Sequence, residues 1–157
     1  MNTAKRIVVQ SVIGAHYFTC EMPWACISIV TEENSWPKIS EANRVGLLQL
    51  AFADIDAAEG DDKGAFNEDH AHRILDFVKE VWDRIGVLMV HCEEGNSRGP
   101  AVAAAISRIH LGEDEVYFLP YMYWPNRLVY RILLDTAGKR GEYLGPNDLS
   151  SCPTPGA

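Results

Sequence analysis

Cysteine is scarce in this sequence. The chain of 157 residues has four cysteines, namely Cys20, Cys26, Cys92 and Cys152. Their spacing is not that of a zinc site, and they are too few for a small secreted domain held together by disulfides. A chain of this length buries about 70% of its unfolded surface without such links. We therefore expect one domain with no metal and no cofactor, in a reducing cytoplasm.

Positive charge is also in short supply. There are 14 Lys and Arg residues against 22 Asp and Glu, which gives a formal net charge of -8. A surface of this sign repels nucleic-acid backbones and anionic membranes, so we expect neither as a partner. Any anionic substrate must then be bound by local groups, against the field of the whole protein.

Long apolar runs are absent as well. The two longest, around Arg6–Ile13 and Gly86–Val90, are much shorter than the roughly 20 residues that cross a bilayer. Short apolar and β-branched segments bounded by turn-forming residues are typical of strands. Four segments have this pattern: Arg6–Ile13, Ala25–Val30, Gly46–Phe52 and Val87–Val90.

Helix signals alternate with these strands. Asn67 can cap a helix that Gly86 ends, and Pro100–Ile109 and Asn126–Thr136 predict two more helices. The alternation predicts an α/β fold, a single-domain sandwich whose central, mainly parallel sheet is flanked by helices. We expect the domain to span residues 1–143, followed by a flexible C-terminal tail over residues 144–157, which is rich in proline and glycine.

The most informative segment joins the strand at Val87–Val90 to the helix at Pro100. It places Cys92 directly after a buried strand, and Arg98 follows six positions later. Ligands of open α/β sheets bind at the carboxyl ends of the strands, where a helix N-terminus offers unpaired N–H groups. The same field favours a thiolate at Cys92, and the arginine fork matches two oxygens of a tetrahedral oxyanion. The segment therefore predicts an anion site that contains a nucleophile.

These residues also carry a family resemblance. His91-Cys92, five residues and then Arg98 resembles the His-Cys-x5-Arg signature of the protein tyrosine phosphatase superfamily. Gly95 and Ser97 inside the loop resemble its compact dual-specificity branch, and the whole is similar to small bacterial or phage-type tyrosine phosphatases. The similarity covers residues 45–110 well and the two ends of the chain loosely.

The resemblance implies a role for each matching residue. Cys92 would attack phosphorus, Arg98 would bind the phosphoryl oxygens, and Asp54 would protonate the leaving oxygen and later activate water. His91 would orient the loop and tune the thiolate. The backbone of the loop would cradle the phosphate through Glu93, Glu94, Gly95, Asn96, Ser97 and Arg98. The implied partner is a phosphorylated protein or a small aryl phosphate, and we expect a monomer.

The identity of the general acid stays open in the sequence. Leu50–Asp54 resembles the strand that ends at the family's aspartate, and the alternation of Leu50, Phe52 and Asp54 favours that residue. Asp56 is the first alternative, and the later acids Asp61 and Asp62 belong to the same cluster.

Two features of the loop depart from the family pattern. Gly99 stands where the family usually has a Ser or Thr, whose hydroxyl stabilises the departing thiolate. Either breakdown of the phosphoenzyme is slow, or Ser97 compensates. Glu93 and Glu94 add negative charge to the mouth of the site, which disfavours polyanionic substrates and favours a phosphorylated residue in a neutral or basic peptide.

The leading hypothesis is thus a cysteine-dependent phosphomonoester hydrolase with a phosphocysteine intermediate. One rival is a non-catalytic phosphate-binding module, a pseudophosphatase, and another is a rhodanese-like sulfurtransferase that forms a persulfide on Cys92. His70 and His72 do not share a helix face, so a solvated first turn is favoured over a metal site there. Aromatic residues crowd the C-terminal third, where packing competes with a role in lining the site.

Overall fold

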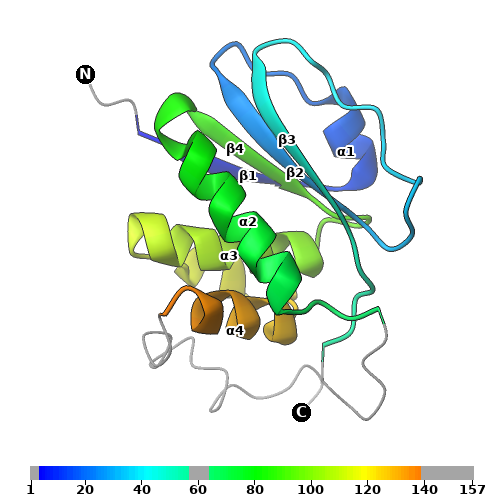
Figure 1. The fold of residues 1–157 in the computed structure, drawn as a ribbon, viewed down its shortest axis with the longest axis vertical. Coiled ribbons are helices and arrows are strands. Elements are labelled where there is room, and N and C mark those ends of the chain that lie inside the picture. The colour runs from blue at the N-terminus through cyan, green and yellow to red at the C-terminus, as the bar shows by residue number, and fades with distance from the viewer. Residues whose placement is uncertain (1–3, 57–63, 139–157) are drawn as a thin grey trace.

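The computed structural model describes residues 4–56 and 64–138. Its centre is a four-stranded sheet in which every paired strand is parallel, in the order β1-β4-β2-β3. The strands are β1 (Arg6–Gln10), β2 (Trp24–Val30), β3 (Arg44–Ala51) and β4 (Val87–His91). β2 and β4 occupy the centre and are buried along their whole length, and their sequences are apolar except for Ser28 and His91. The predicted α/β class is confirmed, and all strands point the same way (Figure 1).

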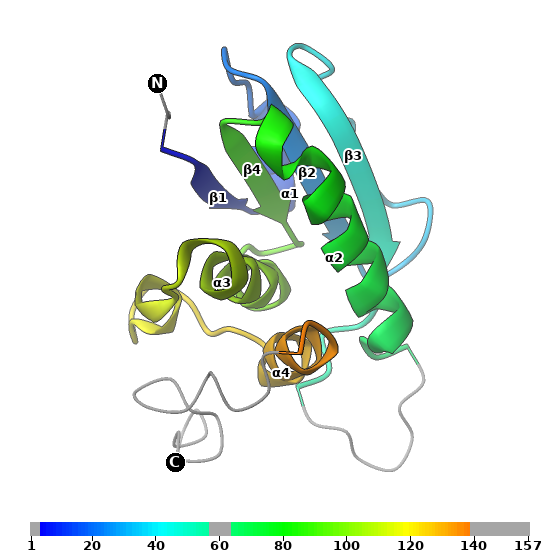
Figure 2. The same ribbon diagram turned by 60° about the vertical axis from the view of Figure 1, so that its left-hand side comes forward.

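Helices cover both faces of this sheet. α2 (Glu68–Val81), α3 (Arg98–Leu111) and α4 (Arg127–Thr136) lie on one side, and the short α1 (Val12–Tyr17) lies on the other (Figure 2). Alternate residues of β2 divide accordingly: Ile27 joins the three-helix core, and Cys26 joins the smaller core around α1. Burial raises the pKa of Cys26 to about 12, so this cysteine is a neutral core residue.

The first predicted strand was too long at its C-terminal end. The expected strand Arg6–Ile13 ends at Gln10, and α1 begins at Val12. Ser11 separates the two elements, because its side chain accepts a hydrogen bond from the Gly14 N–H (3.1 Å) and caps the helix. An apolar run alone cannot distinguish the end of a strand from the first turn of a helix.

The other helix boundaries shift by a few residues. α2 is capped by Asn67 as predicted, but it ends at Val81 and a 3-10 turn, η1 (Trp82–Arg84), fills the space before Gly86. α3 begins at Arg98, two residues before the predicted start at Pro100. A second 3-10 turn, η2 (Glu115–Phe118), precedes α4, which Asn126 caps as predicted. Because α3 starts early, Arg98 lies in its first turn.

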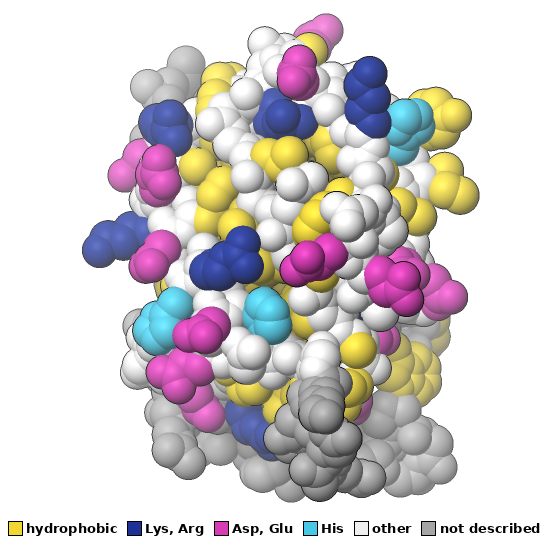
Figure 3. All heavy atoms as spheres, turned by 45° about the vertical axis from the view of Figure 1, so that its right-hand side comes forward, with side chains coloured by type: hydrophobic (Ala, Val, Ile, Leu, Met, Phe, Trp, Pro, Cys, Tyr) yellow, Lys and Arg dark blue, Asp and Glu magenta, His cyan; other side chains and the backbone are white. Residues whose placement is uncertain are grey.

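Some predictions fall outside the described residues. The C-terminal tail, Asp61, Asp62 and Cys152 are among them. Over residues 4–56 and 64–138, no helix combines the length and the apolar character that crossing a bilayer requires. The face of the molecule in Figure 3 carries acidic side chains interspersed with Lys, Arg and apolar groups, without a broad basic patch.

Candidate active site

The loop between β4 and α3 begins with a buried cysteine. The side chain of Cys92 is 2% exposed, and its Sγ accepts a hydrogen bond from the Gly95 N–H (3.3 Å). Gly95 has a φ of 79°, and a Cβ atom there would lie 2.9 Å from the backbone nitrogen of Ser11. Glycine is therefore required at position 95 by both the left-handed backbone and the close approach of the β1–α1 connection.

Neighbouring segments hold the carbonyl groups of this loop. The N–H of Val12 donates to the carbonyl of Glu93 (3.0 Å), and that of Trp124 donates to the carbonyl of Asn96 (2.7 Å). The N–H of Asn126 donates to Ser97 in the same way (3.0 Å). These hydrogen bonds fix the loop from both sides, and backbone N–H groups of a loop held in this way can bind an anion.

Arg98 connects the loop to the ends of two neighbouring strands. Its side chain is 7% exposed. Its Nη1 donates to the carbonyl of Phe52 (2.8 Å), just after β3, and to Oγ1 of Thr31 (3.0 Å), just after β2. Its Nη2 donates to Oε1 of Glu93 (3.1 Å). The guanidinium thus spans the carboxyl edge of the sheet, where ligands of such sheets bind.

Part of this guanidinium has no partner. Of its five N–H donors, the buried Nε has no acceptor within the described residues. Oε1 of Glu93 also accepts the N–H (3.1 Å) and the hydroxyl of Thr31, so Glu93 and Thr31 together occupy the Nη1–Nη2 end. The Nε–Nη2 edge is left with two parallel donors, the geometry that matches two oxygens of a tetrahedral oxyanion.

His91 holds the start of the loop. Its Nδ1 lies 3.1 Å from the carbonyl of Cys92 and its Nε2 contacts the hydroxyl of Ser28. Because a carbonyl can only accept, Nδ1 carries the hydrogen and Nε2 accepts from Ser28. Burial lowers the pKa of His91, with the hydrogen bond to Cys92 opposing the shift and the charge of Arg98 adding to it. The ring is therefore neutral at neutral pH and links β2 to the loop.

The structure separates Asp54 from Asp56. Oδ1 of Asp54 accepts hydrogen bonds from Oγ of Ser97 (2.8 Å) and from Nδ2 of Asn126 (2.8 Å). Its Oδ2 has no hydrogen-bond partner in the described part of the chain. Asp56 instead accepts from the Arg127 N–H and lies 3.7 Å from its Nε, at the start of α4. Of these two acids, Asp54 contacts the cysteine loop and Asp56 contacts the first residue of α4.

These contacts also decide what Ser97 does. The sequence left open that its hydroxyl compensates for Gly99 beside the thiolate. In the structure that hydroxyl donates to Asp54, and the hydrogen bond to Sγ of Cys92 comes from the Gly95 backbone. A Cβ atom on Gly99 would lie 3.3 Å from Sγ, so position 99 is the one from which a side chain would reach the sulfur.

Sequence reasoning missed two contributors to this arrangement. Asn126 was predicted as a helix cap in preference to a substrate ligand, and it does accept from the Val129 N–H (3.0 Å). Its amide also donates to Asp54 and to the carbonyl of Ile55 (3.1 Å), which fixes the acidic segment against α4. Thr31 was not singled out in the sequence; its place directly after the predicted strand Ala25–Val30 was the one signal that could have revealed it.

The histidine and aromatic residues that the sequence also singled out lie outside the cysteine loop. His70 accepts from the Asn67 N–H (3.0 Å) in the capping box of α2, and residues 4–56 and 64–138 contain no cluster of three metal-ligating side chains. Among the aromatic residues, Tyr130 is fully buried, whereas Trp124 is 53% exposed and its backbone contacts the loop. Tyr130 is therefore a core residue, whereas Trp124 lies at the surface beside the cysteine loop.

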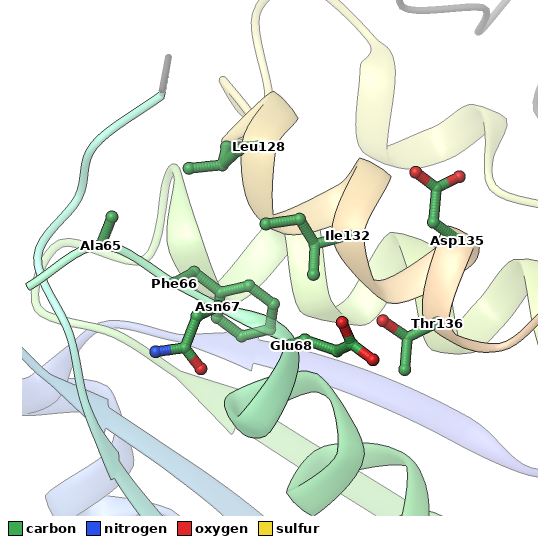
Figure 4. A pocket seen from close by; sticks show the side chains of 8 residues that line it. All are labelled: Ala65, Phe66, Asn67, Glu68, Leu128, Ile132, Asp135 and Thr136. Atoms are coloured by element: carbon green, nitrogen blue, oxygen red, sulfur yellow. The ribbon is translucent and has the colours of Figure 1, made fainter. Parts of the chain in front are cut away.

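A hollow of about 370 Å³ lies between the start of α2 and α4. Figure 4 shows Leu128 and Ile132 along α4 facing the segment that contains Phe66. The lining residues are Ala65, Phe66, Asn67, Glu68, Leu128, Ile132, Asp135 and Thr136. None of them belongs to the loop from Cys92 to Arg98, so this hollow is separate from the candidate anion site.

Comparisons with known proteins locate the fold. No protein-family model and no curated protein matches this sequence. Human DUSP28 is similar in structure, with a TM-score of 0.56, 16% identity and coverage of 84% of this chain and 91% of that one. So is a human tyrosine phosphatase-like serine/threonine/tyrosine-interacting protein, with a TM-score of 0.53, 19% identity and coverage of 77% and 78%.

A third similar structure is a mouse protein assigned as a dual specificity phosphatase, in complex with zinc tungstate. It has a TM-score of 0.50, 18% identity and coverage of 79% of this chain and 76% of that one. The chain has a dual-specificity phosphatase fold. At these identities the likeness establishes the fold, and a fold by itself does not establish activity.

Proposed function

We propose that this chain is a cysteine-dependent phosphomonoester hydrolase of the tyrosine or dual-specificity phosphatase type. One arrangement carries the proposal: Cys92 Sγ and the unpartnered Nε–Nη2 edge of Arg98 belong to a single loop at the carboxyl edge of the sheet. A nucleophile and a bidentate oxyanion donor are the two groups that phosphoryl transfer to sulfur requires. The structures that share this fold include dual-specificity phosphatases, which supports the proposal.

The first chemical step forms a phosphocysteine. The Cys92 thiolate attacks phosphorus, the S–P bond forms, and the bond from phosphorus to the leaving oxygen breaks with its electron pair on that oxygen. Asp54 supplies the proton that the leaving oxygen takes up. Because Ser97 and Asn126 both bond to Oδ1, Oδ2 is the atom that carries this proton. Arg98 and the loop N–H groups stabilise the charge on the equatorial oxygens.

The second step hydrolyses the intermediate. Water attacks phosphorus and passes a proton to the Asp54 carboxylate, the S–P bond breaks, and the thiolate returns to Cys92. Phosphate leaves and both groups regain their starting states. The neutral His91 takes no proton in either step; its hydrogen bonds to Ser28 and Cys92 keep the sulfur at the base of the loop.

The negative charges at the mouth of the site favour a substrate with little negative charge beyond its phosphate. Glu94 is exposed and Glu93 is half-exposed, and both are anionic. We propose a phosphorylated protein side chain in a neutral or basic peptide, or a small aryl phosphate, as the substrate class.

The test is turnover with a simple aryl ester. Hydrolysis of para-nitrophenyl phosphate in the presence of EDTA is expected, and rapid acid quenching during turnover should trap phosphate on Cys92, identified by peptide mass spectrometry. Absence of both turnover and trapped phosphate would contradict the proposed function. Persulfide formation on Cys92 with thiosulfate, without phosphatase turnover, would instead support a sulfurtransferase.

Gly99 favours one second candidate, a phosphate-binding pseudophosphatase. The residue that the family resemblance expects here would place a hydroxyl beside the departing thiolate, and this chain has no side chain at that position. Tight tungstate binding without turnover or phosphocysteine would identify this alternative.

Gly99→Ser is expected to raise the steady-state rate on para-nitrophenyl phosphate by up to about 100-fold, because a hydroxyl at this position would stabilise the thiolate as the S–P bond breaks. The initial burst of nitrophenol should change little, since phosphoenzyme formation does not depend on that hydroxyl. Stopped-flow measurement of both phases checks this.

Gly99→Ala is the matched control. It adds the same Cβ atom, 3.3 Å from Sγ, without the hydroxyl, so it should give no rate increase. Equal steady-state rates for wild type and Gly99→Ser would show that phosphoenzyme breakdown does not limit turnover.

A further inference from the structure

A carboxylate of the loop itself contacts the guanidinium of Arg98. Oε1 of Glu93 accepts from Nη2 of Arg98 (3.1 Å) and from both the N–H and the hydroxyl of Thr31. The same hydroxyl oxygen accepts from Nη1 of Arg98 (3.0 Å). Arg98, Thr31 and Glu93 therefore form a closed ring of hydrogen bonds, which we call the Arg98 clamp.

The clamp leaves the adjacent Nε–Nη2 edge of the guanidinium for a ligand. Thr31 and the carbonyl of Phe52 use both hydrogens of Nη1, and Glu93 uses the Nη2 hydrogen on the same end. A guanidinium is planar and rigid, so fixing one end fixes the direction of the other. The clamp therefore fixes the direction in which the N–H of the buried, unpartnered Nε points.

We propose that Glu93 is a positioning residue: its carboxylate, together with Thr31, orients Arg98 so that the Nε–Nη2 edge faces the substrate phosphoryl group. This inference rests on the proposed function and assigns a role that the sequence did not reveal. In the sequence, Glu93 was expected to offer its backbone to the phosphate, and its side chain was expected only to add negative charge at the mouth of the site.

Glu93 is well suited to this role. Hydrogen bonds from Thr31 and Arg98 lower the pKa of its carboxyl, against a smaller effect of burial, so it stays ionised at neutral pH. Its ion pair with Arg98 joins a nearly buried guanidinium to a half-exposed carboxylate. Without Glu93, Arg98 loses the one contact with a described residue that fixes Nη2, and misplacing a binding group by about 1 Å can cost as much as 100-fold in rate.

Glu94 provides a matched control with the same charge. It is exposed and its Oε2 contacts only the side-chain amide of Asn96 (3.4 Å) within the described residues. Removing either glutamate deletes one negative charge from the mouth, which by electrostatics alone strengthens binding of an anion. The clamp predicts the opposite sign at position 93.

The experiment compares Glu93→Ala, Glu94→Ala and Thr31→Val. We expect Glu93→Ala to raise both KM for para-nitrophenyl phosphate and Kd for tungstate roughly tenfold or more. Glu94→Ala should lower both values, up to about threefold. Thr31→Val keeps every charge and nearly the same shape, yet it breaks the ring and should weaken binding in the same direction as Glu93→Ala.

Glu93→Gln separates orientation from general structural damage. It keeps an acceptor for Arg98 and Thr31, so it should recover part of the affinity that Glu93→Ala loses. Thermal unfolding of each variant checks that it folds; if Glu93→Ala does not fold, Thr31→Val and Glu93→Gln still decide. Equal effects of Glu93→Ala and Glu94→Ala, or tighter tungstate binding in both, would overturn the inference.

Failure of the inference and failure of the proposed function are distinguishable. A wild type that hydrolyses the ester while the two glutamate variants behave alike refutes the clamp and leaves the function standing. A wild type that binds tungstate without turnover refutes the hydrolase, and the Kd values still test the clamp. A wild type that neither binds nor hydrolyses refutes both.

Discussion

Cys92→Ser is expected to lower kcat on para-nitrophenyl phosphate by at least about a thousandfold, because the serine hydroxyl is not ionised at neutral pH and cannot replace the thiolate as nucleophile. The change is nearly isosteric, and the Gly95 N–H can still donate to the new oxygen. Tungstate Kd should therefore stay within a few-fold of wild type, since Arg98 and the loop backbone are unchanged. Steady-state kinetics and isothermal titration measure the two quantities.

Cys20→Ser is the control for this variant. Cys20 is a partly buried free cysteine that packs against the smaller core around α1, outside the loop. Turnover should survive its replacement. Full hydrolysis by Cys92→Ser would show that the phosphocysteine route is wrong, and equal loss in both variants would point to a general effect of removing cysteine.

Asp54→Asn should reduce kcat by roughly 100-fold or more, the usual contribution of a general acid. The loss should grow as the leaving group becomes poorer, because a phenol needs the proton more than nitrophenol does. Asparagine keeps an oxygen that can accept from Ser97 and Asn126, so the segment should stay in place and tungstate binding should be nearly unaffected. Rates on phenyl and para-nitrophenyl phosphate give the comparison.

Asp56→Asn tests the alternative acid on the same substrates. Asp56 accepts from the Arg127 backbone and pairs with its side chain. Its replacement should therefore lower the unfolding temperature and leave kcat nearly unchanged. Should Asp56→Asn instead lose turnover in a leaving-group-dependent way while Asp54→Asn keeps it, the general acid would be Asp56.

Much of the fold was predictable because its signals are local. The continuous apolar run Val87–Val90 indicated a strand buried on both faces, and Asn67 and Asn126 indicated helix starts, which the structure confirms. The first helix was missed because α1 has six residues and follows β1 after a single residue, Ser11. Apolar side chains at positions 12 and 13 continue the pattern of the strand into that helix.

The candidate site was only partly predictable, for a related reason. Cys92, Arg98 and the glycine between them lie within one short segment, so their spacing is visible in the sequence. Thr31 lies 67 residues from Arg98, and Asn126 lies 72 from Asp54. Nothing in either local sequence indicates those hydrogen bonds.

Hydrophobic periodicity and spacing within one segment were enough to predict the parallel α/β fold and the placement of a cysteine and an arginine in one loop before a helix. The tertiary structure shows that Asp54 contacts that loop whereas Asp56 contacts the start of α4, that the Ser97 hydroxyl donates to Asp54, and that Glu93 binds Arg98. Those outcomes depend on how the ends of β2, β3 and β4 converge at one edge of the sheet, where residues distant in the chain compete for the same hydrogen-bonding groups.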